Sequence, residues 1–209
     1  MNRYVRSLRS FAARARGRFR RKSDPRKLLL ERMPRGSVCA EIGVFKGDFS
    51  AEILRVVRPR VLHLIDPWKY ETSEDYKQSW YGGESGVNQN HMDGLHQAIL
   101  DRFRREIASG RVKIHRSASA DAAAQFVPSY FDWVYIDGNH LYEFAKRDLE
   151  AYYPKVKPGG FLTGDDYGPG GWWEGGVQRA VDEFISLGQC KLLAATERQF
   201  ILQKPAGQV

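Results

Sequence analysis

Acidic residues next to glycines, at the ends of apolar runs, are the groups in this chain best suited to bind a ligand. Glu41 lies in a short apolar run that leads into Gly43 and Gly47. The next apolar run ends in Asp66. In an α/β sheet, a glycine turn and an acidic strand end meet at the carboxyl edge, where nucleoside ligands bind. Glycine lets a ligand approach the backbone, and a carboxylate can accept both ribose hydroxyls, so the pattern predicts a nucleoside cofactor.

The spacing of the glycines argues against a dinucleotide. The dinucleotide fingerprint G-x-G-x-x-G seats a pyrophosphate on a helix N-terminus. Here only Gly43 and Gly47 are present, and Glu41 would oppose a pyrophosphate, whereas it suits a cationic ligand. A glycine-containing strand–helix turn without any ligand is the alternative, because short glycine motifs are common.

A second group of acids follows two later apolar runs. The run from Phe131 ends in Asp137, and the run after the Pro-Gly-Gly turn at Pro158 ends in Asp165 and Asp166. These hard oxygen ligands on neighbouring strand ends suit Mg²⁺ or a similar ion. The sequence shows no obvious basic partner for them, which favours a divalent cation. The alternative is that they cap helices or bind substrate without a metal.

His140 is the best candidate for a general base. It follows Asp137 by three residues, and an imidazole with a pKa near neutrality can take a proton from a hydroxyl. A lone histidine is more often a structural hydrogen-bonding group, so that interpretation stays open. We therefore predict Asp137 and His140 as the catalytic residues.

Together these segments resemble a known family. The turn at Glu41 to Gly47, the motif D-G-N-H-L-Y-E from Asp137, K-P-G-G from Lys157 and D-D-Y from Asp165 are similar to class I S-adenosylmethionine-dependent methyltransferases. Within that class they resemble the branch of small-molecule and sugar O-methyltransferases. The resemblance covers about residues 36–204. It implies a hydroxyl acceptor and a divalent metal, although Asn139 replaces a carboxylate that serves as the base in some relatives.

The resemblance also implies roles in cofactor binding. Glu41 is expected near the methionine ammonium, Gly43 against the methionine portion and Asp66 on the ribose hydroxyls. The adenine edge is expected at Ser117 and Ala118, although the acidic residue of many relatives is missing there. The predicted cofactors are S-adenosyl-L-methionine and Mg²⁺. The predicted cofactor-binding residues are Glu41, Gly43, Gly47, Asp66, Ser117 and Ala118, and the predicted metal ligands are Asp137, Asp165 and Asp166.

Apolar runs and helical periods alternate along the chain, which is typical of a parallel sheet with helices on both faces. The last two strands are too close in sequence for a crossover helix, which predicts an antiparallel hairpin. We therefore expect an α/β, Rossmann-like class I methyltransferase fold with a seven-stranded, mostly parallel sheet. The predicted strands are 37–42, 60–66, 111–115, 131–137, 158–164, 190–196 and 199–204, and the predicted helices are 25–33, 47–57, 90–108, 119–126, 141–153 and 175–187.

The segment 67–90 is polar and aromatic without a clear period. Long loops in compact domains are usually functional or disordered, and both interpretations stay open here. Because this loop starts at the end of the second strand, we expect it to act as a lid over the substrate. Its aromatic residues, together with a tryptophan pair in a later glycine-rich loop, would form walls; they are Trp68, Tyr70, Trp80, Tyr81, Trp172 and Trp173.

The positive charge of the chain is concentrated at its start. The formal net charge is +8, from 33 basic and 25 acidic residues, but residues 1–27 hold eleven Lys or Arg and one Asp. The remaining 22 basic and 24 acidic residues give −2, so the predicted domain 28–209 is not a basic nucleic-acid-binding body. The arm 1–27 has amphipathic helical spacing, which suits an anionic membrane surface, a nucleic acid, its own domain or a partner subunit in a homo-oligomer. A mobile, solvated arm is the other interpretation that stays open.

The remaining composition is ordinary for one domain of 209 residues. We expect no transmembrane segment and no secretory signal, and predict a cytoplasmic protein that could be peripheral to a membrane through its arm. Cys39 and Cys190 are expected to be reduced core residues.

Three other functions stay open. A nicotinamide oxidoreductase is disfavoured by the missing third glycine. A nucleic-acid methyltransferase could use the basic arm, but D-G-N-H stands where base-amino-group enzymes typically carry N/D-P-P-Y/F. A non-catalytic nucleotide-binding or scaffold protein of the same fold is the third alternative.

Overall fold

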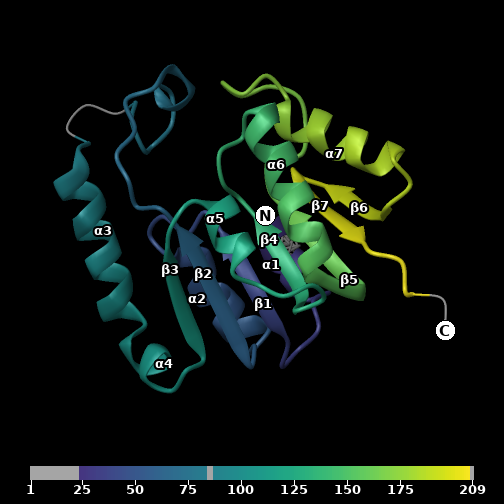
Figure 1. Cartoon of the computed structure of the whole chain (residues 1–209), viewed down its shortest axis with the longest axis horizontal. Helices are drawn as coiled ribbons and strands as arrows, with labels where there is room; N and C mark the ends of the chain where they lie inside the picture. Colours follow the sequence, from purple (N-terminus) through teal and green to yellow (C-terminus); the bar gives the residue numbers. More distant parts are fainter. Residues whose placement is uncertain (1–23, 84–86, 208–209) are drawn as a thin grey trace, which may run out of the picture.

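The computed structural model describes residues 24–83 and 87–207 and contains one sheet of seven strands. The strands are β1 (Val38–Ile42), β2 (Val61–Asp66), β3 (Val112–Arg116), β4 (Phe131–Ile136), β5 (Val156–Gly164), β6 (Lys191–Thr196) and β7 (Gln199–Gln203). Their spatial order is β3-β2-β1-β4-β5-β7-β6 (Figure 1). Strands β1 to β5 are parallel, and β7 is antiparallel to both β5 and β6. This order and the terminal hairpin confirm the predicted fold.

Helices cover both faces of the sheet. They are α1 (Pro25–Leu30), α2 (Asp48–Val56), α3 (Gln89–Arg102), α4 (Arg104–Ala108), α5 (Ser119–Ala124), α6 (Tyr142–Tyr152) and α7 (Gly176–Ser186), with short 3-10 turns η1 (Glu74–Tyr76) and η2 (Tyr153–Lys155). In Figure 1, α5, α6 and α7 lie in front of the sheet, and α1 and α2 lie behind it.

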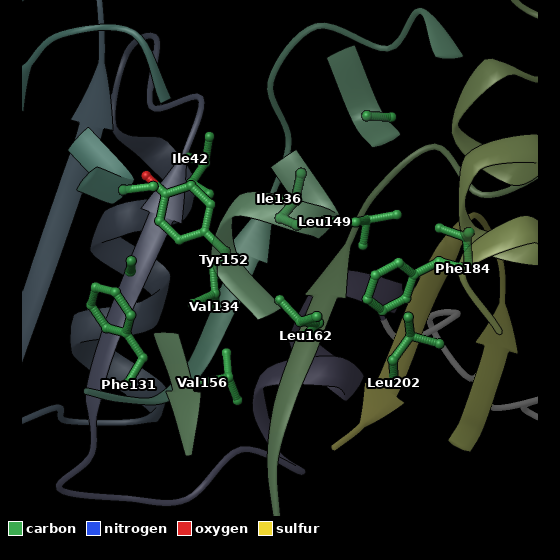
Figure 2. Close-up of a cluster of buried hydrophobic side chains, with 14 of the residues drawn as sticks. Ile42, Phe131, Val134, Ile136, Leu149, Tyr152, Val156, Leu162, Phe184 and Leu202 are labelled. Atoms are coloured by element: carbon green, nitrogen blue, oxygen red, sulfur yellow. The ribbon is translucent and has the colours of Figure 1, made fainter. Parts of the chain in front are cut away.

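Each face has its own hydrophobic core because side chains alternate along a strand. On β4, Val134 and Ile136 pack with α5, α6 and α7, and Figure 2 shows this cluster. Their neighbours Trp133 and Tyr135 point to the opposite face and pack with α1, α2 and α3. Cys39 belongs to this second core, and both cysteines are buried and free, as predicted. The two cores fix the strand ends that carry the candidate site.

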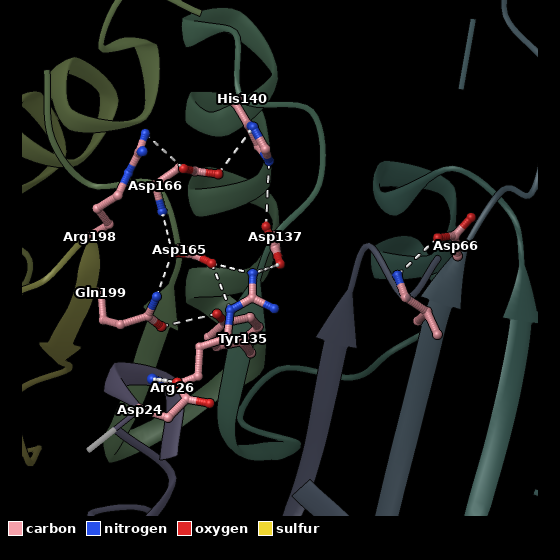
Figure 3. Close-up of polar contacts among 11 residues, drawn as sticks. Asp24, Arg26, Asp66, Tyr135, Asp137, His140, Asp165, Asp166, Arg198 and Gln199 are labelled. Atoms are coloured by element: carbon pink, nitrogen blue, oxygen red, sulfur yellow. Dashed lines mark hydrogen bonds and ion pairs between the residues drawn. The ribbon is translucent and has the colours of Figure 1, made fainter. Parts of the chain in front are cut away.

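The hairpin that ends the fold has a tight two-residue turn. Glu197 and Arg198 connect β6 to β7 with φ angles of 49° and 71°. Positive φ at both central residues matches the right-handed twist of the paired strands, as in a type I′ turn. The turn carries the Arg198 side chain toward the carboxyl end of β5 (Figure 3).

Two elements differ from the sequence prediction. The predicted helix over 90–108 is interrupted at Phe103, whose φ of −105° and ψ of 17° separate α3 from α4. Strand β5 begins at Val156 and not at the predicted position 158, so Pro158 lies inside the strand, and the register against β4 shifts between Phe131 and Trp133. Proline lacks an N–H, so a strand tolerates it at such an irregularity.

Of the predicted arm 1–27, residues 1–23 lie outside the described residues. Residues 24–27 form the N-cap and first turn of α1, where the Asp24 side chain accepts a hydrogen bond from the Arg26 backbone N–H. In the part of the chain that the structure describes, no helix is long and apolar enough to cross a bilayer.

Candidate active site

The turn after β1 lies against the end of β4. Gly43 has a φ of +84°, and a Cβ atom there would lie 1.9 Å from the Asp137 carbonyl oxygen. The Gly43 N–H donates to the Ile65 carbonyl oxygen of β2 at 3.0 Å. Glycine is required because both the backbone angle and the close approach exclude a side chain. The turn thereby brings the ends of three strands together.

Glu41 lies beneath this turn and is 2% exposed. The Ser50 hydroxyl of α2 donates a hydrogen bond to its carboxyl group. Burial raises the pKa of Glu41 to about 8, although Ser50 favours the charged form. A carboxyl group with so few donors can ionise when a cation such as an ammonium binds nearby.

Asp66 is placed at the end of β2, as predicted, but its oxygens are already bonded. Oδ2 accepts from the backbone N–H groups of Val44 and Phe45 at 2.9 Å each and from the Tyr81 hydroxyl. Oδ1 accepts from the Trp68 N–H at 2.7 Å. A carboxylate has about four lone-pair sites, so ribose hydroxyls would have to displace a donor. Tyr81 is the donor that can leave, because the other three belong to the backbone.

The other predicted cofactor residues have different surroundings. Ser117 follows β3, and its Oγ is buried without a hydrogen-bond partner among the residues that the structure describes, so its contact with the adenine edge stays a prediction. Ala118 is exposed at the start of α5. Gly47 precedes α2 with a φ of +72°, and a Cβ there would lie 2.6 Å from Cδ1 of Ile99. Gly47 is therefore required for packing, and its predicted contact with a cofactor stays a prediction.

Asp137, His140 and Asp166 come together beside the β4 and β5 ends (Figure 3). His140 Nε2 lies 3.4 Å from Oδ1 of Asp137, and Nδ1 lies 3.2 Å from Oδ2 of Asp166. Nδ1 is buried and makes no contact with hydrogen-bond geometry. Burial favours the neutral imidazole, but Asp137 and Asp166 outweigh it and raise the pKa of His140. One ligand atom from each residue lies within 4.8 Å of the others, a spacing that fits a metal ion.

Asp165 does not belong to this group, because its carboxylate is hydrogen-bonded to other side chains. It accepts hydrogen bonds from the Arg26 guanidinium, with Nε to Oδ2 at 2.8 Å, and from Gln199 Nε2. Arg26 also donates through Nη2 to Oδ2 of Asp137 at 2.9 Å. Arg198 Nη2 lies 3.1 Å from Oδ1 of Asp166. The expectation that these acids lack basic partners is therefore wrong.

Sequence reasoning missed both arginines. Arg26 is separated from Asp165 by 139 positions, and the basic run around it gave no sign that one member folds into the site. Arg198 lies in the hairpin turn, and its place opposite Asp166 depends on the twist of β6 and β7. The prediction of the hairpin was the one signal that could have located Arg198.

Aromatic residues from two loops stand near the cluster. Trp172 and Trp173 pack on His140, with ring centroids at 6.1 and 4.8 Å. In the segment after β2, Trp80 stacks on Phe45 with centroids at 4.8 Å. Trp68 is instead fully buried in the core. The described part of the predicted lid thus folds against the turn after β1.

The strand order, the antiparallel hairpin and the glycine turn beside Glu41 and Asp66 define a class I, S-adenosylmethionine-dependent methyltransferase domain. Residues 40–167 match the profile of a family described as "Methyltransferase domain". Because this match spans more than half of the chain, the protein belongs to that methyltransferase family. No curated protein matches the sequence.

Solved structures share the fold at low sequence identity. A protein from Corynebacterium glutamicum is 16% identical with a TM-score of 0.58, over 88% of this chain and 80% of that one. An O-methyltransferase family protein from Burkholderia thailandensis is 12% identical with a TM-score of 0.57, over 88% of this chain and 56% of that one. The 1,6-didemethyltoxoflavin-N1-methyltransferase of B. thailandensis, solved with S-adenosylhomocysteine, is 12% identical with a TM-score of 0.55, over 87% and 77%. Their low identity limits the comparison to the fold.

Proposed function

We propose that this protein transfers a methyl group from S-adenosylmethionine to a hydroxyl group of a small molecule, assisted by a divalent cation. The observation that carries the proposal is the meeting of Asp137, His140 and Asp166 at the same sheet edge as Glu41 and Asp66. Family membership supports the methyl donor. The D-G-N-H and D-D-Y motifs, which resemble those of small-molecule O-methyltransferases, support the acceptor class.

Methyl transfer from a sulfonium depends mainly on positioning an acceptor lone pair behind the methyl group. A hydroxyl acceptor must also lose its proton. His140 is the group that takes this proton, since its imidazole lies between two carboxylates that stabilise the imidazolium formed. The Trp172 and Trp173 rings beside His140 would hold the acceptor against it.

The residues present fit a cation in a site that differs from the predicted one. Asp137 and Asp166 offer carboxylate oxygens to a cation and leave His140 as the base, whereas Asp165 is engaged by Arg26 and Gln199. A bound divalent cation would supply Lewis acidity that lowers the pKa of the acceptor hydroxyl.

The acceptor is proposed to be a small molecule, because the Trp172 and Trp173 rings stand beside His140, where its reacting hydroxyl would lie. The basic arm 1–27 and its partners stay a separate prediction. The proposed cofactor contacts remain Glu41, Gly43, Gly47, Asp66, Ser117 and Ala118.

Methyl transfer can be tested with methyl-labelled S-adenosylmethionine and a panel of small molecules that carry single or adjacent hydroxyls, with Mn²⁺, Mg²⁺ or a chelator. We expect label in an adjacent-diol acceptor and at least about a tenfold loss with chelator. His140→Ala should reduce the rate by about 100-fold or more while cofactor and metal affinity persist. His91→Ala, an exposed position on α3, is the matched control.

Equal rates with and without chelator would remove the cation from the proposal. A wild-type rate of methyl transfer in His140→Ala would show that His140 is not the base. Loss of metal affinity in that variant would instead make His140 a metal ligand, because one imidazole cannot serve both roles at once.

A further inference from the structure

The Arg26 side chain reaches from α1 into the acidic cluster (Figure 3). Its Nε donates to Asp165 Oδ2 at 2.8 Å and its Nη2 to Asp137 Oδ2 at 2.9 Å. The guanidinium also lies over the Phe49 ring, 5.3 Å from the centroid. Two bonds from a planar fork to two carboxylates are the contacts for which arginine is best suited.

Arg26 is held in place by a folded helix. The next residues of α1 include Leu29 and Leu30, which are 3% and 1% exposed in the core beneath the sheet. The Asp24 side chain caps the helix by accepting the Arg26 N–H. The guanidinium is therefore held at the cluster by a folded helix, although the side chain is 38% exposed.

The charges of the cluster nearly balance without a metal ion. Asp137, Asp165 and Asp166 contribute three negative charges, and Arg26 and Arg198 contribute two positive charges through contacts at 2.9 and 3.1 Å. A divalent cation added to this group meets two fixed positive charges at short range. The three carboxylates are largely buried, whereas the Arg26 and Arg198 side chains are 38% and 50% exposed, so the repulsion is screened only in part and weakens metal binding.

Asp137 is the residue that the Arg26 guanidinium and a divalent metal ion would share. Its Oδ1 faces His140, on the side of the candidate metal ligands, and its Oδ2 is bonded to Arg26. Electron density drawn toward the guanidinium lowers the donor strength of the same carboxylate toward an ion. Asp165 is likewise occupied by Arg26, and by Gln199.

We propose that Arg26 is a built-in counter-ion that competes with a divalent cation for Asp137 and Asp165, and so sets the metal affinity of the site. The inference rests on the cation site of the proposed function. It predicts that removing the guanidinium strengthens metal binding. The opposite hypothesis, that Arg26 orients Asp137 as a metal ligand, predicts weaker binding.

The test is direct titration of the full chain with Mn²⁺, followed by electron paramagnetic resonance of the free ion, in the absence of cofactor and acceptor. Arg26→Gln should bind Mn²⁺ at least about tenfold more tightly than the wild type. Arg26→Lys keeps the charge and should stay within about threefold of the wild type. Lys27→Gln removes an equal charge from the next position, where Lys27 pairs only at the surface with Glu31 at 3.8 Å, and should change little.

Unchanged or weaker binding in a folded Arg26→Gln variant would overturn the proposal. If that variant does not fold, the side-chain Nε–H resonance of Arg26 in the wild type gives the answer: Mg²⁺ should shift it, and an unshifted resonance at saturating Mg²⁺ would overturn the competition. If Arg26→Gln binds Mn²⁺ tightly and the wild type does not, the competition is supported. If the wild type also transfers the methyl group equally well without metal, the cation-assisted mechanism is contradicted. No binding by any variant would refute both.

Discussion

Glu41, Asp66 and Asp137 stand at or near the ends of three adjacent strands, and each carboxyl group has a different set of donors. Glu41 has the Ser50 hydroxyl, Asp66 has three backbone N–H groups and the Tyr81 hydroxyl, and Asp137 has Arg26 and His140. Because donors stabilise the charged form, these three acids differ in how readily they accept a new cation or hydroxyl.

Glu41 is expected to release a proton when the cofactor binds. Its pKa of about 8 means that the free protein holds it mostly protonated at pH 7, and a nearby ammonium would favour the carboxylate. Calorimetry at pH 7 in buffers of different ionisation enthalpy should show release of about one proton by the wild type. Glu41→Gln should release none. Equal proton release by both proteins would show that Glu41 does not meet the ammonium.

Asp66→Ala should weaken S-adenosylmethionine binding at least about tenfold and also lower the free energy of unfolding by about 2–4 kcal/mol. The stability loss is expected because the variant leaves the Val44, Phe45 and Trp68 N–H groups without their acceptor. Tyr81→Phe is the matched variant, since it frees one acceptor site on Asp66 and should bind the cofactor at least as tightly as the wild type. Cofactor titration of the folded Asp66 variant with unchanged affinity would remove Asp66 from the site.

At the scale of elements, the turn after β1 requires a glycine at position 43 because a side chain there would collide with the Asp137 backbone. Gly36, which also has a positive φ, has no such neighbour and serves as the comparison. Both residues have positive φ, +84° at Gly43 and +68° at Gly36, but no atom lies within 4 Å of a Cβ built at Gly36. Gly36→Ala should cost about 1–2 kcal/mol from backbone strain alone. Gly43→Ala should cost at least about 2 kcal/mol more, as its Cβ meets the Asp137 carbonyl. Chemical denaturation measures both, and equal losses would contradict the close approach.

The pairing of β2 and β3 contains a buried histidine pair that should make stability depend on pH. His63 Nδ1 lies 2.9 Å from His115 Nε2, and His63 Nε2 lies 3.2 Å from the Tyr130 hydroxyl. Burial, with smaller contributions from His115 and Lys113, lowers the pKa of His63 to about 3. The unfolded chain therefore binds a proton below its ordinary pKa while the folded protein does not, so stability is lost as pH falls from about 6.5 toward 3.

Unfolding by urea should therefore give a free energy about 2 kcal/mol lower at pH 5 than at pH 7.5 in the wild type, from His63 alone. His63→Gln should remove that part of the slope. His91→Gln changes an exposed histidine on α3 and should retain it. An identical slope in the wild type and His63→Gln would refute the assignment.

The elements were predictable where the pattern is local. Apolar runs such as Val61 to Ile65 end in a carboxylate or a glycine, so strand ends could be read from sequence. The contacts of Arg26 could not, because Asp137 and Asp165 lie 111 and 139 positions away and no local pattern couples them. The contact between Tyr81 and Asp66 was missed for a similar reason, since an aperiodic loop does not indicate which way its side chains point.

At the scale of the whole molecule, the sheet brings two chemically different regions to one edge. Glu41 and Gly43 lie in and after β1, and Asp66 ends β2. The ends of β4 and β5 present Asp137, His140 and Asp166 (Figure 3). Gly43 joins the two regions through its contact with the Asp137 backbone. A cofactor bound on the first region would thus place its methyl group toward the second.

Calorimetric titration of the folded protein with S-adenosylmethionine and, separately, with NAD tests the central claim most directly. The methyltransferase assignment predicts one equivalent of S-adenosylmethionine bound, at an affinity that falls in Asp66→Ala, and no measurable binding of NAD. Binding of NAD without binding of S-adenosylmethionine would contradict it.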